Sequence, residues 1–143
     1  MHMKQFGLIF YFTFQSLLLA QDYSVLPIEF SHSGDDAIGT RLGYKINEEI
    51  RESKSMALTF DETIARMQLI LVTLEPNSSN SYLTVYSATW VWNNPEQPLP
   101  FYITSMVGTC GTNRVNEVAE DLVAQTDKHL NDIRKIFVAA KNR

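Results

Sequence analysis

The sequence predicts an α+β protein in which a mostly antiparallel sheet of about five strands carries two amphipathic helices on one face. Two stretches, one ending at about Glu52 and one following Asn113, repeat apolar side chains with a helical period. Between them, four strand-like stretches are joined by short connections, which is typical of an antiparallel meander. Each helix needs a sheet face against which to bury its apolar stripe, so the elements form a two-layer sandwich in the order β-α-β-β-β-β-α.

The composition is that of one globular domain. The chain has 143 residues, of which 45% are hydrophobic and 20% are charged. The formal net charge is −4, and Lys and Arg form no run that would neutralise a line of phosphates, so the sequence argues against a nucleic-acid partner. The mature chain holds a single cysteine, which excludes an intramolecular disulfide.

Residues 1–20 have the form of a secretory signal peptide. Lys4 supplies the positive charge, Phe6–Ala20 is an apolar run broken by three polar residues, and Ala20 is a small residue for cleavage. An uncleaved signal anchor is the alternative, because Leu18 is bulky for its place before the cleavage point. The sequence thus predicts an exported bacterial protein, periplasmic or extracellular. Residues 21–143 form one domain without a transmembrane span, with a tail that frays from about residue 138.

The first half of the domain is predicted as a strand and a helix. Asp22–Phe30 alternates as a strand, in which Pro27 suggests an edge position. A loop over Ser31–Asp36 follows, and Ser33 with Asp36 fits a capping box. The helix then continues to about Glu52, with one apolar stripe made by Ile38, Leu42, Ile46 and Ile50.

The second half is predicted as four strands and a helix. Met56–Phe60 is a short strand, and Arg66–Leu74 is apolar on both faces, as a central strand is. Tyr82–Trp92 and Phe101–Val107 form a hairpin around a loop that contains three prolines. Gly108–Asn113 is predicted as the turn into the last helix, with Thr112 or Asn113 as the cap.

Cys110 is the strongest candidate for chemistry in the sequence. A thiol between glycines and close to a helix N-terminus gains thiolate character, and the GTCG segment is similar to a nucleophile elbow with Cys in place of Ser. His32, in the loop after the first strand, is the candidate base for a catalytic Cys110. The alternative is a small buried thiol in a glycine-flanked turn, because free cysteines are among the most buried residue types.

The aromatic column of the long strand is the second candidate site. Tyr82, Tyr86, Trp90 and Trp92 alternate onto one face. If the helices cover the opposite face, this column is an exposed binding surface for a partner or a stacked ligand. The alternative is that the helices cover the aromatics, which then form the core.

Motifs for metals and nucleotides do not occur in the sequence. The two histidines of the mature chain, His32 and His129, are far apart, and no HExxH, CxxC, GxGxxG or P-loop pattern appears. Asp35 and Asp36 fit a helix cap better than a cation site. We therefore expect neither a metal nor a cofactor.

The order of elements resembles that of small periplasmic α/β domains of the TolB N-terminal and curli-secretion type. The resemblance is carried by Val25-Leu-Pro-Ile-Glu-Phe30, by the spacing of Ile38 and Leu42 in the helix, and by the strand meander with its closing helix. It covers about Tyr23–Asp132, but the TWVW run and the GTCG turn depart from it. The resemblance implies a role in envelope assemblies through protein contacts.

The sequence therefore favours an exported, non-enzymatic domain that binds a protein or a cell-envelope component. Association with a second copy, through an edge strand or through the aromatic face, is compatible with this role. Two rival functions stay open. One is an enzyme that uses Cys110 with His32 as its base, and the other is a carrier that binds a small ligand on the Trp90/Trp92 face.

Overall fold

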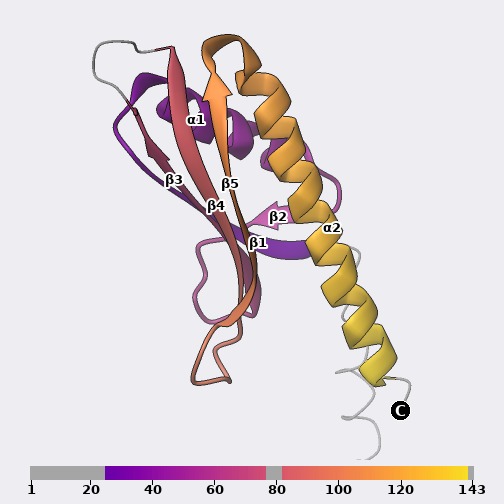
Figure 1. Ribbon diagram of the computed structural model, residues 1–143. Helices are drawn as coiled ribbons and strands as arrows, with labels where there is room; N and C mark the ends of the chain where they lie inside the picture. The colour runs from indigo at the N-terminus through magenta and orange to yellow at the C-terminus, as the bar shows by residue number, and fades with distance from the viewer. Residues whose placement is uncertain (1–24, 77–81, 142–143) are drawn as a thin grey trace, which may run out of the picture.

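The computed structural model describes residues 25–76 and 82–141 (Figure 1). The predicted signal peptide, residues 1–20, lies outside the described residues. The elements in chain order are β1 (Leu26–Ser33), α1 (Ala37–Glu52), β2 (Met56–Leu58), β3 (Arg66–Leu74), β4 (Leu83–Asn93), β5 (Phe101–Gly111), the 3₁₀ turn η2 (Thr112–Arg114) and α2 (Val115–Lys141). The predicted order, strand, helix, four strands and helix, is confirmed.

The five strands form one sheet in the spatial order β2-β1-β3-β4-β5. The β3–β4 and β4–β5 pairs are antiparallel, as expected for a hairpin-linked meander. Strand β1 lies between β2 and β3 and runs parallel to both. Sequential strands β2 and β3 are therefore not neighbours, although the short connection between them predicted a direct pair. Pro27 belongs to an inner strand, at the point where β1 meets the three-residue strand β2.

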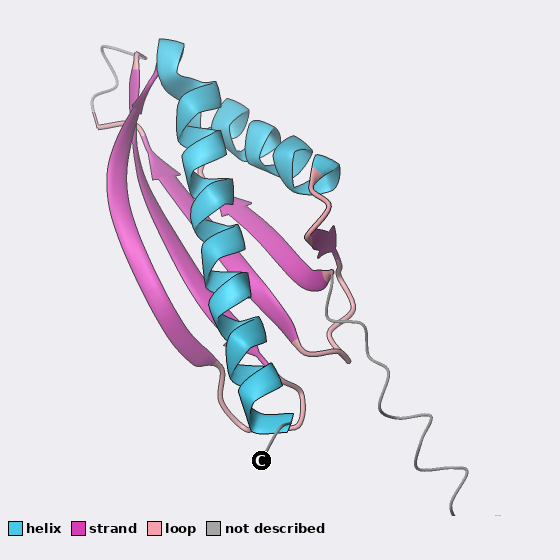
Figure 2. Cartoon of the chain, turned by 90° about the vertical axis from the view of Figure 1, so that its right-hand side faces the viewer, coloured by secondary structure: helices cyan, strands magenta, loops and turns pink. Residues whose placement is uncertain are grey.

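Both helices cover the same face of the sheet, which makes the predicted two-layer α+β sandwich (Figure 2). The four residues of the predicted α1 stripe are all buried, from Ile38 to Ile50. Opposite them lie the buried side chains of Ile28, Leu69 and Leu71 from the two central strands. On the solvent side of α1, Lys45 contacts Glu49 at 3.0 Å, the spacing at which helical ion pairs form.

Helix α1 begins three residues later than the predicted capping box of Ser33 and Asp36 implies. The N-cap is Asp36, whose Oδ1 accepts a hydrogen bond of 2.6 Å from the backbone N–H of Gly39. Ser33 instead ends β1, so the strand extends through His32 into the stretch expected to be a loop. This extension places the His32 side chain under α1.

Helix α2 spans 27 residues and lies along the sheet (Figure 2), and its buried apolar residues lie between Val115 and Leu130. Residues 138–141, expected to fray, continue the helix. Neither helix in residues 25–76 and 82–141 combines the length and the apolar character needed to cross a lipid bilayer.

Strand β5 is longer than predicted. It continues through Gly108, Thr109 and Cys110 to Gly111, and the helical segment starts only at Thr112. The glycines that indicated a turn have a packing reason instead: a Cβ on Gly108 would lie 2.5 Å from the Tyr86 hydroxyl oxygen. The expected turn at Gly108–Asn113 is therefore wrong, and Cys110 belongs to a strand.

Candidate functional site

Cys110 is fully buried on β5, where it pairs with Thr84 of β4. Its thiol donates a weak hydrogen bond of 3.6 Å to the carbonyl of Gly111. Burial raises the pKa of the Cys110 thiol, and the positive charges of Arg114 and Arg41 oppose this only in part. A buried thiol with a raised pKa holds little thiolate near neutral pH. The position favours the interpretation of Cys110 as a packed core residue.

His32 does not lie beside Cys110. It is on β1, which β3 and β4 separate from β5, and its Nε2 hydrogen bonds with the Thr73 hydroxyl at 2.9 Å. Burial lowers the pKa of His32, and the nearby carboxylate of Asp36 opposes this shift. Among the described residues, no hydrogen bond joins His32 to Cys110. The base expected for a catalytic thiol is therefore occupied elsewhere.

A polar cluster that the sequence did not predict surrounds the start of α1. It contains His32, the N-cap Asp36, and the buried hydroxyls of Thr73 and Thr84. Although burial opposes ionisation, the hydrogen bond from the Gly39 N–H and the neighbouring hydroxyls of Thr73 and Thr84 hold the pKa of Asp36 below its usual value. The cluster leaves no free volume, because a methyl group on Gly39 would overlap Thr73 and Asp36. Its role is to fix α1 on the sheet.

The aromatic column faces the helices, so most of it is core. Trp90 is 1% exposed and Tyr86 is 7% exposed. The Trp90 indole Nε1 donates a hydrogen bond of 2.8 Å to the Thr126 hydroxyl of α2, and its ring meets His129 edge-on at 5.2 Å. Neither Tyr86 nor Trp90 is available to a ligand. This arrangement favours the core alternative for these two residues.

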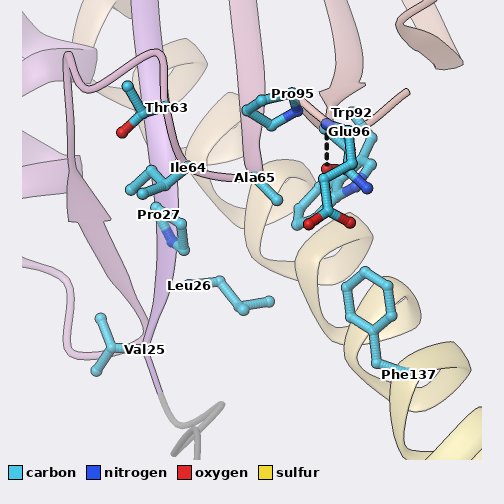
Figure 3. A pocket seen from close by; sticks show the side chains of 11 residues that line it. Val25, Leu26, Pro27, Thr63, Ile64, Ala65, Trp92, Pro95, Glu96 and Phe137 are labelled. Carbon is cyan, nitrogen blue, oxygen red and sulfur yellow. Dashed lines mark hydrogen bonds between the residues drawn. The ribbon is translucent and has the colours of Figure 1, made fainter. Parts of the chain in front are cut away.

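Tyr82 and Trp92, at the two ends of the column, are accessible. Tyr82 precedes β4 and is 73% exposed. Trp92 is half-buried, and its ring lies 5.5 Å from the ring of Phe137 near the end of α2. Trp92 and Phe137 form one wall of a pocket of about 510 Å³ (Figure 3). The other walls come from the start of β1, from Ile64 and Ala65 before β3, and from the β4–β5 loop.

The opposite face of the sheet carries no helix in residues 25–76 and 82–141 (Figure 2). Its end near the β4–β5 loop is polar. The Nε of Arg66 donates to Glu29 at 2.5 Å, the Gln68 amide donates to the same carboxylate at 2.9 Å, and the Asn93 amide donates to Gln68 at 3.0 Å. This network crosses β1, β3 and β4 and satisfies the only charged side chains that the described strands place on this face.

The rest of the helix-free face is apolar and uncharged. We call it the open patch, and it alternates apolar side chains with Ser and Thr. Val72 is 47% exposed, Leu74 68% and Leu83 39%, which are high values for aliphatic residues on the inner part of a sheet. The open patch consists of Ile70, Val72, Leu74, Leu83, Val85 and Val107.

The described residues contain no group of three or more His, Cys, Asp and Glu placed to hold a metal ion. The acidic residues next to α1 divide into the capping Asp36 and a solvent-exposed Asp35. Two candidate binding features thus reach solvent: the pocket beside Trp92, which we call the Trp92 pocket, and the open patch on the other face.

Comparisons with known proteins match the fold only. No protein-family model matches the chain, and no curated protein matches it. A solved structure of a hypothetical protein from Chlamydia trachomatis matches with a TM-score of 0.50 at 7% identity, over 74% of this chain and 98% of that chain. The arrangement of helices and strands therefore recurs in a protein with an unrelated sequence.

Two further solved structures match more weakly. A minor lipoprotein from Acinetobacter baumannii has a TM-score of 0.36 at 12% identity, over 75% of this chain and 94% of that chain. The rare lipoprotein B from Shewanella oneidensis has a TM-score of 0.27 at 16% identity, over 80% of this chain and 96% of that chain. Likenesses at these scores carry no argument about this protein. The resemblance to TolB and curli-secretion domains stays a prediction.

Proposed function

We propose that the protein is an exported, non-enzymatic binding domain that docks a partner protein on the open patch. The observation that carries the proposal is the contrast between the two faces of the sheet. Helices bury most of one face, whereas the other exposes a set of aliphatic side chains. Monomeric proteins rarely leave such a surface without a partner, because each buried aliphatic side chain contributes about 1.5–3 kcal/mol.

The charge distribution supports a protein rather than a lipid surface as the occupant. The open patch has no Lys or Arg to meet anionic headgroups, and the chain carries a net charge of −4. Serine and threonine between the aliphatic residues, at Ser87 and Thr89, offer hydroxyls for hydrogen bonds within a protein interface. The partner surface is therefore apolar at its centre and uncharged.

Site-specific photocross-linking tests this proposal. A photoreactive residue at position 72 is compared with one at Tyr44, which is 67% exposed on the helical side. We expect one protein to be captured from position 72 only. That protein, once purified, is expected to bind the wild-type domain and to lose about tenfold in affinity for Val72→Lys. Equal capture at both positions, or capture of phospholipid instead of protein, contradicts the proposal.

Export is the second part of the proposal, and it rests on the signal peptide predicted in residues 1–20. Cleavage after Ala20 predicts that the protein recovered from outside the cytoplasm begins at Gln21. N-terminal sequencing of the secreted or periplasmic protein measures this. Recovery of the full chain from a membrane fraction supports the signal anchor instead.

The Trp92 pocket supports a second candidate function, the binding of a small apolar molecule. Its volume is within the range of ligand sites, and Trp92 and Phe137 offer aromatic surface. An uncharged probe such as N-phenylnaphthylamine is expected to quench Trp92 while buried Trp90 keeps its emission. The Trp92→Phe variant is then expected to lose the response. Unchanged emission of the wild-type protein over the full titration contradicts this function.

A further inference from the structure

Strand β5 forms a long outer edge of the sheet. It is the last strand in the spatial order, and at its end the chain passes into the helical layer (Figure 1). The backbone hydrogen bonds of the described residues join β5 to β4 and to no element on its other side. The opposite edge of the sheet is β2, which has only three residues. The unpaired edge of β5, in contrast, extends over eleven residues.

This edge lacks most features that normally prevent strand association. Natural edge strands carry Lys or Pro, are short, or contain bulges. The sequence of β5, FYITSMVGTCG, contains neither a charged residue nor a proline. One irregularity occurs, at Ile103, where the pairing shifts between Trp90 and Val91 of β4. From Thr104 to Gly111 the pairing with β4 is regular, so eight residues present an unprotected edge.

The direction of the backbone groups follows from one hydrogen bond. The Thr112 N–H donates to the carbonyl of Tyr82 at 3.1 Å. N–H and C=O groups alternate between the two sides of an antiparallel strand, so Cys110, Gly108 and Met106 point toward β4. The intervening residues, Ser105, Val107 and Thr109, direct their N–H and C=O groups outward. Val107 is 73% exposed at the centre of this edge.

We propose that two copies of the chain pair their β5 strands antiparallel across a two-fold axis at Val107, joining two sheets into one. In this register each Val107 lies opposite the other, and Ser105 lies opposite Thr109 of the second copy. The side chain of Met106, 38% exposed, then lies over Gly108, which has none. The two-fold axis brings Val107 opposite its own copy and its neighbours opposite other residues of the same strand, so the absence of charge on β5 makes the strand compatible with itself.

The expected dimer is weak and reversible. A ladder of eight residues buries less area than a standard interface, which places it among the smaller, transient associations. We therefore expect a dissociation constant of roughly 10–100 µM. This association shares Val107 with the open patch, but it uses the backbone edge of β5, whereas docking on the patch uses the side chains of the inner strands, such as Val72.

Sedimentation equilibrium of the mature domain over about 5–500 µM tests the proposal. We expect a monomer–dimer equilibrium for the wild-type protein and a monomer throughout for Val107→Lys, because two ammonium groups then meet at the axis. Val72→Lys is the matched control, since Val72 is exposed on the same face but belongs to inner strand β3. It is expected to dimerise normally while losing the proposed partner, so the two proposals fail separately. A wild-type monomer at the highest concentration, or equal dissociation by both variants, overturns the edge pairing.

Disulfide trapping tests the register. In a Cys110→Ala background, a mixture of Ser105→Cys and Thr109→Cys chains is expected to form a mixed disulfide, because directly opposite residues lie about 5.5 Å apart at Cα. Either variant alone is expected to stay uncross-linked under the same oxidation. Efficient homodimer formation by Ser105→Cys alone contradicts a two-fold axis at Val107.

Discussion

The indole nitrogen of Trp90 donates a hydrogen bond of 2.8 Å to the hydroxyl of Thr126, which joins the sheet to the middle of α2 inside the core. Thr126 in turn donates to the carbonyl of Leu122 at 2.8 Å, so both polar groups of this contact are satisfied without water. The contact fixes the position of α2 relative to β4.

Replacing Thr126 with Val is expected to destabilise the domain. The variant keeps the shape of the side chain but leaves the indole N–H buried without an acceptor, which costs about 1–3 kcal/mol. Urea unfolding measures the change in the free energy of unfolding. Thr40→Val, an exposed position on α1, is the matched control and is expected to change stability little. An equal effect of the two substitutions contradicts this role for Thr126.

Replacing Gly39 with Ala is expected to lower stability, although Ala has the higher helix propensity by about 1 kcal/mol. The new methyl group overlaps Thr73 and the carboxylate of Asp36, and such overpacking costs about 1–3 kcal/mol. Thermal unfolding followed by circular dichroism measures the change. At Gly111 the nearest atom to an added Cβ is 3.8 Å away, so Gly111→Ala is the control with little expected loss. A stabilised Gly39→Ala variant would contradict this prediction, because Thr73 and Asp36 would then move aside without a loss of stability.

The Cys110 thiol is expected to react slowly with iodoacetamide in the folded protein. It is fully buried and its pKa is raised by that burial, so both access and thiolate are limited. Labelling in urea is expected to be at least about a hundredfold faster. A cysteine introduced at Tyr44 in a Cys110→Ala background provides the rate for an exposed thiol. Fast labelling of native Cys110 supports the enzyme hypothesis instead.

Stability is expected to fall as the pH is lowered from about 7.5 to 5. Burial lowers the pKa of both His32 and His129 in the folded protein. The unfolded chain therefore takes up protons on these rings at a higher pH than the folded chain, so unfolding becomes easier as the pH falls through the ordinary histidine pKa. Denaturation midpoints across this range measure the slope. The double variant His32→Gln and His129→Gln is expected to flatten it, and an unchanged slope assigns the effect to other groups.

The helical stripe and the main strands were predictable because their periodicity reports local burial. Ile38, Leu42, Ile46 and Ile50 all face the sheet, and β3 is an inner strand covered by helices on one side. Its other face is also apolar but stays exposed at Val72 and Leu74. The position of β1 between β2 and β3 was not predictable from connection lengths. The short connection favours pairing of β3 with β2, but β1, which comes earlier in the sequence, pairs with that edge of β3 instead. In this inner position β1 buries Leu26, Ile28 and Phe30 under the helices.

The candidate sites were predicted less well than the fold. Alternation shows that Tyr86 and Trp90 share a face, but it does not say which face the helices cover, because Leu83, Val85 and Val91 are also apolar. Gly108 and Gly111 indicated a turn because glycine is common in turns. In the structure the Tyr86 ring packs against Gly108, and β5 continues to Gly111. The cluster around Asp36 joins residues from four elements, and no local signal in the sequence brings them together.

The central position of β1 sets an order for folding. This strand leaves the ribosome before the rest of the domain, yet it stays unpaired until β2 and β3 have been synthesised, since Ile28 pairs with both Leu58 and Met67. Such long-range parallel pairing raises contact order and slows folding. The nascent chain can therefore complete this sheet only after Met67 has been synthesised. Such a delay is compatible with the export proposed above, because an exported chain crosses a translocation channel before it becomes compact.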